Sequence, residues 1–367
     1  MNHSTIICTK DRSEILKKTL RIYYEFEYKG EIIIGDDSND KEFDNLHNEV
    51  LNLSDRLKIH HFKGPKIENS NRIIRSVNTL NEIFKYLKTD YVTSKGDDDF
   101  IFPTFVKKGI KFLEKNLGFS CYLAPEMKVF FKNDWLLVNS FLKTWHKIEL
   151  EDPLERCVDY SNRPNLPWAG VCRSTSFKKI LKIKEKTNRD ALIKSNDKTF
   201  SFIDLEIPWC LAVLANGKLY YDPSIISGTR GEFIGVDRIT DQGINSKDPV
   251  SLAGSIYELQ QKDSYIALRE LHEDLFYLIK DNNSKYEDEI LKNDIWVIMW
   301  RLFGAYQGRL LSKPFVNDNY FNKSYIYIIY KKIKKLFISY LLRDKFKLKK
   351  SKDYLDFINC IKKIKTL

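Results

Sequence analysis

The first hundred residues alternate short apolar runs with longer segments in which apolar residues recur every three or four positions. The short runs are rich in β-forming residues and predict four strands, at 5–9, 31–35, 56–62 and 91–94. The longer segments predict helices over 12–26 and 69–88. Strands that alternate with helices in this way predict an α/β fold, a mostly parallel sheet flanked by helices.

The pattern becomes less regular further along the chain. The middle mixes short strands, a loop rich in Pro and aromatic residues at 163–168, and a helix over 204–215 that Asn216-Gly217 ends. Residues 222–243 predict a loop. The last third predicts helices over 256–280, 286–310 and 325–342. We therefore place a domain boundary near residue 245, between an α/β domain at 1–245 and a helical region at 246–367.

Cysteine usage and hydropathy indicate a cytoplasmic protein. The six cysteines are scattered, without a Cys-x-x-Cys pair or a histidine at metal-ligand spacing. This argues against a zinc site and a disulfide framework, and it favours a reducing compartment. We expect no signal peptide, because the N-terminus runs straight into a strand, and no membrane span, because no apolar stretch approaches 18 residues.

The net charge is concentrated at the C-terminus. Residues 321–367 hold fourteen Lys and Arg against three Asp, which accounts for the whole net charge of +11. Over 325–341 the apolar residues follow helical spacing opposite four lysines, as in a helix that lies on an anionic membrane surface. The alternative is a helix that packs on the rest of the protein with its lysines outward. Peripheral association with the inner face of the cytoplasmic membrane is therefore one expectation.

Acidic residues follow two predicted strands. Asp36 and Asp37 end one strand, and Asp97-Asp98-Asp99 follow another. Ligands of parallel sheets bind at the carboxyl ends of the strands, and Mg²⁺ or Mn²⁺ often binds one or two carboxylates plus substrate phosphates. The alternative is a solvated acidic turn, but the apolar flanks of the triplet favour a metal site.

These segments resemble a known family when they are taken in order. Thr5-Ile6-Ile7-Cys8-Thr9-Lys10-Asp11-Arg12, Ile32-Ile33-Ile34-Gly35-Asp36-Asp37-Ser38-Asn39-Asp40 and Gly96-Asp97-Asp98-Asp99-Phe100 are similar to the nucleotide-sugar-binding half of family 2-like glycosyltransferases with the GT-A fold. The resemblance covers residues 3–225 and is greatest to a bacterial subgroup whose metal motif reads Asp-Asp-Asp-Phe. It implies a GT-A-like domain at 1–245, with a nucleotide-sugar half at about 1–103 and an acceptor half at about 104–245.

The resemblance also implies roles for individual residues around the donor. Thr9 and Arg12 would lie beside the nucleotide, and Asp36 or Asp37 would reach the base or ribose. The alternative for the Asp36-Asp37 segment is an Asx turn. Asp99 would bind the metal, with Asp97 nearer the ribose and metal-bound water and Asp98 between them. Arg72 and Arg75 would add positive charge near the phosphates, or else lie solvated on the surface.

The acceptor side is implied by two further segments. Glu206 falls where the family carries the general base, and Asp204 is an alternative base or an ordinary helix N-cap. The apolar neighbours of Glu206 favour a raised pKa. Trp168, Gly170 and Arg173 lie on a segment that resembles the acceptor border, where Trp168 stacks on a sugar or belongs to the core.

The sequence thus predicts a metal-dependent glycosyltransferase that uses Mn²⁺ or Mg²⁺. Its donor would be a nucleotide sugar, UDP-linked, and its acceptor a glycan or lipid-linked hydroxyl, with inversion at the anomeric carbon. The Lys-, Ile- and Asn-rich composition favours a bacterial source and synthesis of surface polysaccharide or lipopolysaccharide. The alternatives are a sugar-nucleotide nucleotidyltransferase, a nucleic-acid-binding protein or nuclease that uses the basic tail, and an inactive scaffold. No glycine-rich loop follows the first strand, which argues against a nucleotidyltransferase. The first 320 residues are neutral, so we expect no nucleic acid partner.

Overall fold

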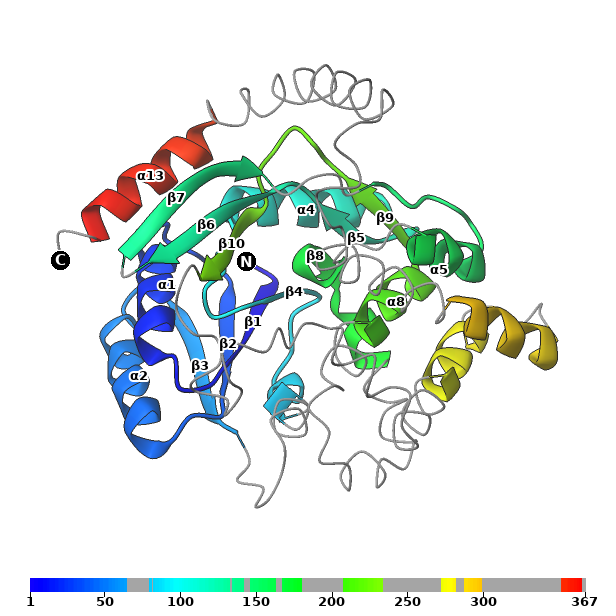
Figure 1. Ribbon diagram of the computed structural model, residues 1–367, viewed down its shortest axis with the longest axis horizontal. Helices are drawn as coiled ribbons and strands as arrows, with labels where there is room; N and C mark the ends of the chain where they lie inside the picture. The colour runs from blue at the N-terminus through cyan, green and yellow to red at the C-terminus, as the bar shows by residue number, and fades with distance from the viewer. Residues whose placement is uncertain are drawn as a thin grey trace, which may run out of the picture.

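The computed structural model describes the chain in ten segments. These are residues 1–64, 79–80, 82–132, 134–141, 146–162, 167–179, 207–233, 272–281, 287–298 and 351–364. The described residues form a seven-stranded sheet with helices on both faces, and a smaller three-stranded sheet beside it (Figure 1). The predicted α/β class is confirmed.

The large sheet has the order β3-β2-β1-β4-β8-β5-β9. Its strands are β1 (His3–Thr9), β2 (Glu31–Asp36), β3 (Lys58–Lys63), β4 (Tyr91–Lys95), β5 (Phe119–Leu123), β8 (Val171–Arg173) and β9 (Lys218–Tyr221). Neighbouring strands pair in parallel except at β8, which runs antiparallel to β4 and to β5. The four predicted strands are confirmed, with ends within two residues of the prediction.

Continuous apolar runs form these strands because both faces of the sheet are covered. Ile6 and Ile33 face one core. This core also takes α5 (Pro153–Asn162), α8 (Ile207–Asn216) and helical residues at 79–80, 82–84, 272–280 and 288–298. Ile7, Ile32 and Ile34 face the other core, under α1 (Ser13–Glu25), α2 (Asp40–Asn52), α4 (Pro103–Lys115) and α13 (Lys352–Ile364). The predicted helix at 12–26 is confirmed, and the described parts of 69–88, 204–215, 256–280 and 286–310 include helix.

Three helices of the second core, α2, α4 and α13, were not assigned by the sequence analysis. In α2 the Asn39 side chain accepts a hydrogen bond from Glu42 N, which caps the helix, and Leu46 and Val50 are buried. In α13 the ring of Phe357 is fully buried against Phe100 and Phe102, which follow the acidic triplet. This end of the basic tail therefore packs on the sheet domain.

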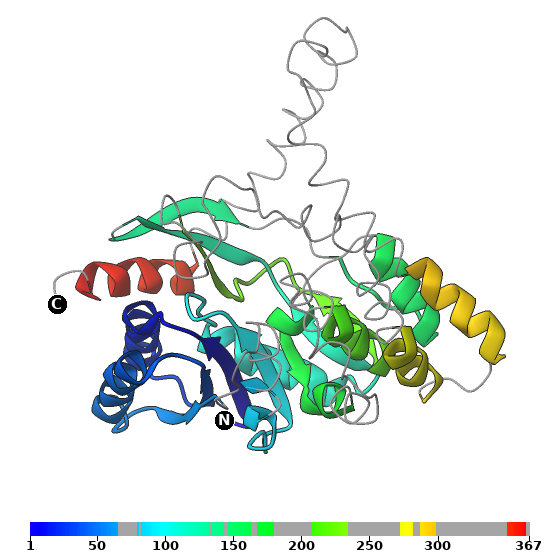
Figure 2. The same ribbon diagram turned by 60° about the horizontal axis from the view of Figure 1, so that its bottom comes forward.

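The small sheet consists of β10 (Gly228–Phe233), β6 (Glu126–Lys132) and β7 (Asp134–Phe141), in that order. It lies next to α13 (Figure 2). An isolated bridge between Ile101 and Gly228 joins β10 to the segment after the acidic triplet. The small sheet thus borders the predicted site.

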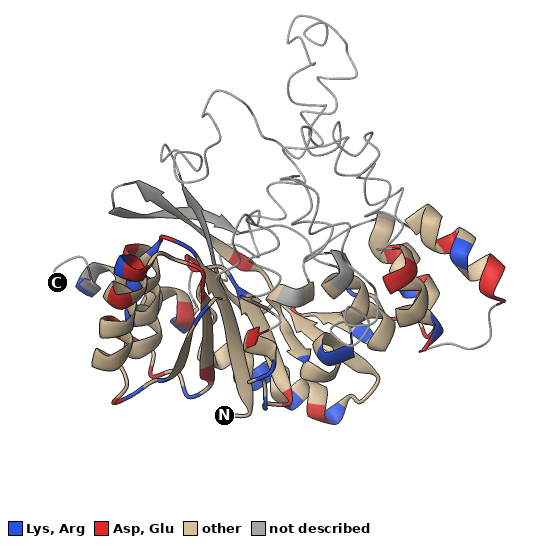
Figure 3. Cartoon of the chain, turned by 90° about the horizontal axis from the view of Figure 1, so that it is seen from below, with Lys and Arg blue, Asp and Glu red and all other residues tan. Residues whose placement is uncertain are grey.

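Several predictions fall on residues that the structure does not describe. The boundary near 245 and the helix at 325–342 lie outside the described residues, so the predicted domains and the membrane-binding helix stay predictions. Acidic and basic residues are interspersed along the described elements in Figure 3. Among the described residues, no helix is both long and apolar enough to cross a membrane.

Candidate functional site

The carboxyl ends of β1, β2 and β4 meet at one edge of the large sheet. Thr9, the last residue of β1, pairs in register with Asp36, the last residue of β2. On the other side of β1, Ile7 pairs with Lys95, two residues before Asp97. The topology therefore brings Thr9, Asp36 and Asp97 together, as expected for parallel strands.

Asp97 is the most enclosed member of the acidic triplet. Thr9 Oγ1 donates to its Oδ2 at 3.0 Å, and Arg12 Nη1 lies 2.6 Å from its Oδ1. Thr19 Oγ1 donates to its backbone oxygen at 2.8 Å. Burial raises the pKa of Asp97 to about 7, and the neighbouring carboxylates add to this rise while Arg12 and Thr9 oppose it. Arg12 and Thr9 therefore do not fully offset the effect of burial on the Asp97 carboxylate.

Arg12 links the triplet to the start of α1. Its Nη2 lies 3.1 Å from Asp98 Oδ2, so one guanidinium contacts two of the three aspartates. The Arg12 side chain is 32% exposed and that of Asp98 is 13% exposed, so the pair borders solvent. Among the described residues, no cluster of three or more His, Cys, Asp or Glu is arranged as a metal site of its own. A hard cation at the triplet would therefore need further oxygen ligands, such as those of substrate phosphates.

A tight turn and β10 hold the triplet in place. Asp99 N donates to Gly96 O at 3.1 Å, and Gly96 N donates to Asp99 Oδ2 at 3.2 Å. Phe100 N then donates to Thr229 Oγ1 at 2.9 Å, and Thr229 N donates to Phe100 O at 2.7 Å. At Gly228 an added Cβ would lie 2.0 Å from Phe100 O, so only glycine permits this close approach. The role of Asp99 as metal ligand stays a prediction.

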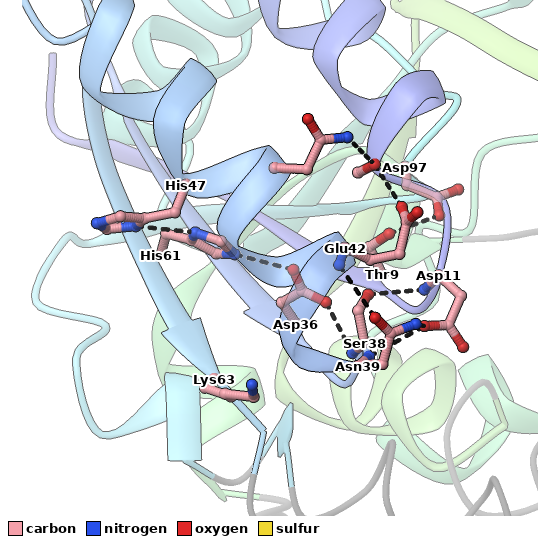
Figure 4. A network of polar contacts seen from close by, with 12 residues as sticks. Thr9, Asp11, Asp36, Ser38, Asn39, Glu42, His47, His61, Lys63 and Asp97 are labelled. Atoms are coloured by element: carbon pink, nitrogen blue, oxygen red, sulfur yellow. Dashed lines mark hydrogen bonds and ion pairs between the residues drawn. The ribbon is translucent and has the colours of Figure 1, made fainter.

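Asp36 and Asp37 differ in their surroundings. Asp36 is fully buried, and its Oδ1 accepts from Ser38 N at 2.9 Å, the Asx turn considered as the alternative. Its Oδ2 lies 3.0 Å from His61 Nε2 (Figure 4). Asp37 N donates to Thr9 O at 3.0 Å, which places Asp37 beside the end of β1. Both oxygens of Asp36 thus have protein donors.

Of the residues predicted to border the acceptor, Arg173 lies away from this edge. Gly170 O accepts from Thr93 Oγ1 at 2.8 Å within the sheet. Arg173 pairs with Tyr91, at the end of β4 opposite to the aspartates, and its guanidinium donates to the oxygens of Phe119 and Leu113. The acceptor role of Arg173 has no support in this geometry. Trp168 lies in η1 (Pro167–Ala169), and its side chain is outside the described part.

Four further predicted residues cannot be placed. Arg72, Arg75, Asp204 and Glu206 lie outside the described residues. Glu206 directly precedes α8, whose C-terminal end is held by the buried Arg156. This guanidinium donates to Leu214 O at 2.6 Å and to Ala215 O at 3.2 Å. The roles of all four residues stay predictions.

Sequence reasoning missed four residues that shape the site: Asp11, Thr19, His61 and Thr229. Each acts through a hydrogen bond to a residue distant in sequence, and Thr229 is 129 positions from its partner. Asp11 adopts a φ of 50°. Asp and Asn take up this conformation more readily than most residues, so the residue type is itself a local sequence signal. The other three give no signal in a single sequence.

Comparisons with known proteins give low similarities. No protein-family model and no curated protein matches the chain. Among solved structures, S. aureus TarS aligns over 87% of this chain and 46% of that chain, with 14% identity and a TM-score of 0.49. TarS 1–349 in complex with UDP-GlcNAc covers 83% of this chain and 89% of that chain, with 12% identity and a TM-score of 0.44.

A third structure is the mannosyltransferase PcManGT from Pyrobaculum calidifontis in complex with GDP-Man and Mn²⁺. It aligns over 99% of this chain and 84% of that chain, with 10% identity and a TM-score of 0.41. This chain spans about half the length of the full TarS chain. At these low similarities, the function of this protein must be argued from its own residues.

Proposed function

We propose that this protein is a metal-dependent glycosyltransferase that moves a sugar from a nucleotide-sugar donor to an acceptor hydroxyl. The observation that carries the proposal is the contact of Arg12 with both Asp97 and Asp98 beside Thr9, at the carboxyl edge of a parallel sheet. Among the described contacts, a single guanidinium meets the two carboxylates of Asp97 and Asp98. A divalent cation held by carboxylates of the triplet would add positive charge at this edge, where a donor diphosphate could bind.

The residues of the triplet would hold Mn²⁺ or Mg²⁺, with Asp99 and Asp97 as the ligands. When bound there, such a metal would act as a Lewis acid and neutralise the leaving diphosphate. Arg12 contributes a planar guanidinium, which suits phosphate oxygens and is partly open to solvent. Arg72 and Arg75 are proposed to add charge on the same side.

Asp37 is the better candidate to meet the nucleoside. The oxygens of Asp36 are already used by Ser38 N and His61 Nε2, so Asp36 shapes the turn. Asp37 lies next to Thr9, and a carboxylate at this place can accept from a uracil imide N–H or a ribose hydroxyl. The donor is proposed to be UDP-linked.

Glu206 is proposed as the general base that takes the proton from the acceptor hydroxyl. Attack from the face opposite to the diphosphate then inverts the anomeric carbon, through a transition state with oxocarbenium character. The acceptor is proposed to be a glycan or lipid-linked hydroxyl of a bacterial surface polysaccharide.

Donor binding tests the first part of this proposal. A panel of UDP- and GDP-linked sugars is added with and without Mn²⁺, and thermal unfolding is followed. We expect one nucleotide to raise Tm only with the metal, and Asp97→Asn to remove the shift. Asp55→Asn is the control, because Asp55 is 60% exposed and far from the triplet in sequence. A wild-type chain whose Tm responds to no nucleotide contradicts the proposal.

Two other products identify the alternatives. Release of pyrophosphate from a nucleoside triphosphate and a sugar 1-phosphate would indicate a nucleotidyltransferase. Cleavage of single-stranded DNA or RNA would indicate a nuclease.

A pair of substitutions tests the base. Glu206→Gln keeps the shape of the side chain and should bind the donor normally, with transfer lowered at least about a hundredfold. Asp204→Asn keeps a good N-cap and should transfer sugar at nearly the normal rate. The opposite result for the two variants would make Asp204 the base.

A further inference from the structure

His61 and His47 form a hydrogen-bonded row that ends on the buried carboxylate of Asp36 (Figure 4). His61 Nε2 lies 3.0 Å from Asp36 Oδ2, and both side chains are 1% exposed. On the other side of the ring, His61 Nδ1 lies 3.3 Å from His47 Nδ1. The ring of Phe43 stacks on His61 with the centroids 4.2 Å apart. Asp36, His47 and Phe43 therefore contact the His61 ring on three sides.

The spacing of these atoms determines which nitrogens carry protons. An ionised carboxylate only accepts hydrogen bonds, so His61 Nε2 carries a proton toward Asp36. The two facing Nδ1 atoms share a single proton, because two N–H groups directed at each other across 3.3 Å would repel. His47 thus holds the neighbouring ring in the arrangement that supplies Asp36 with an oriented N–H donor.

Asp36 transmits this constraint to the turn before Arg12. Its second oxygen accepts from Ser38 N at 2.9 Å, and Ser38 Oγ accepts from Asp11 N at 2.6 Å. Asp11 adopts a φ of 50°, a left-handed conformation that residues other than glycine rarely hold without support. Arg12 is the next residue in the chain. The direction in which its guanidinium leaves the backbone therefore depends on the Asp36–Ser38–Asp11 contacts.

We propose that His61 is a positioning residue for donor binding, which acts through Asp36 and the Asp11 turn on Arg12. This inference rests on the proposed function, in which Arg12 meets the donor phosphates. The alternative is that the two histidines only fill the space between β3 and α2. A side chain of similar volume without an N–H donor separates the two roles, because it fills the space and leaves Asp36 without its partner.

Calorimetric titration of UDP into the full chain, with Mn²⁺ present, tests this role. His61→Leu keeps volume and loses the donor, and we expect it to raise the Kd for UDP about tenfold. His61→Gln retains an N–H within reach of Asp36 and should recover most of the affinity. His60→Leu is the matched control on the same strand, because the ring of His60 stacks on Phe62. Its Kd should equal that of the wild type.

The possible results are distinguishable. Equal Kd values for His61→Leu and the wild type overturn the inference and leave the proposed function intact. A wild-type chain that binds neither UDP nor GDP overturns both. Should His61→Leu fail to fold, the ¹⁵N spectrum of the wild-type histidine side chains tests the inference instead, because it reports which ring nitrogen of His61 is protonated and needs no ligand. A His61 ring protonated at Nε2 supports the inference, and a neutral ring protonated only at Nδ1 overturns it.

Discussion

Lys95 and Glu126 form a buried ion pair that joins the two sheets just before the acidic triplet. Lys95 Nζ lies 2.5 Å from Glu126 Oε1, and the side chains are 0% and 4% exposed. Glu126 Oε2 is buried and has no hydrogen-bond partner among the described residues. The Lys95→Met substitution keeps the length of the side chain and removes its charge, so the carboxylate of Glu126 is left buried without a counter-ion.

The cost of this substitution can be estimated from the burial. Removing one partner of a buried pair typically costs about 3–5 kcal/mol. A carboxyl group of ordinary acidity can avoid the buried charge by taking up a proton, which costs about 3.7 kcal/mol at pH 7. That cost falls by about 1.4 kcal/mol for each pH unit and is nearly gone at about pH 4.3. We therefore expect Lys95→Met to lose about 3–4 kcal/mol at pH 7 and about 1 kcal/mol at pH 5.

Urea unfolding at the two pH values measures this difference. The double variant Lys95→Met/Glu126→Leu removes both charges, and we expect its free energy of unfolding to lie within about 1 kcal/mol of the wild type or above it. A double variant as unstable as the sum of the two single variants would refute the reasoning, and so would a Lys95→Met cost that does not change with pH. Either result would mean that the pair contacts water or other groups.

Three further predictions concern other parts of the chain. Burial lowers the pKa of His3 to about 3, so the unfolded chain binds an additional proton below about pH 6.5. The free energy of unfolding should fall by about 1.4 kcal/mol per pH unit from pH 6.5 toward pH 3. His3→Gln should flatten this part of the stability–pH profile. Parallel profiles for the variant and the wild type would contradict the prediction. Phe357→Ala removes the ring that packs on Phe100 and should cost about 3–5 kcal/mol in urea unfolding. The exposed Leu355→Ala should cost less than about 0.5 kcal/mol, and equal losses would show that α13 does not pack as described. If 321–367 binds membranes, the full chain should sediment with anionic and not with neutral vesicles. Replacing the four lysines at 331–335 by Glu should abolish this, and sedimentation that is unchanged would exclude that surface.

The strands could be predicted because burial on both faces leaves a direct signal in the sequence. Ile32, Ile33 and Ile34 form a continuous apolar run, and all three are fully buried. The edge where the site lies could also be predicted, because parallel strands end at the same side of a sheet. By contrast, α2 has a narrow apolar face that includes Leu46 and Val50, and most of its other residues are polar. Such a helix depends on its cap and its contacts more than on periodicity.

The direction of strand β8 explains why Arg173 lies away from the aspartates. Arg173 was assigned to the acceptor border because residues 168–173 resemble the strand that borders the acceptor in the family. Because β8 runs antiparallel to β4, the end of β8 lies at the start of β4, opposite to the aspartates. The direction of one short strand in a mixed sheet depends on long-range packing, and no local pattern in a single sequence reports it.

Charge balance connects the described contacts with the proposed chemistry. Asp97, Asp98 and Asp99 carry three negative charges when ionised, and Arg12 compensates one of them. Burial raises the pKa of Asp97 to about 7, as expected when the compensation is incomplete. Under the proposed function, a divalent cation would add positive charge beside the carboxylates that Arg12 contacts. A donor diphosphate adds further negative charge at the same edge, so under the proposed function Arg12 has to contact both the aspartates and the phosphates. The turn that fixes Arg12 is for this reason as important to donor binding as the triplet itself.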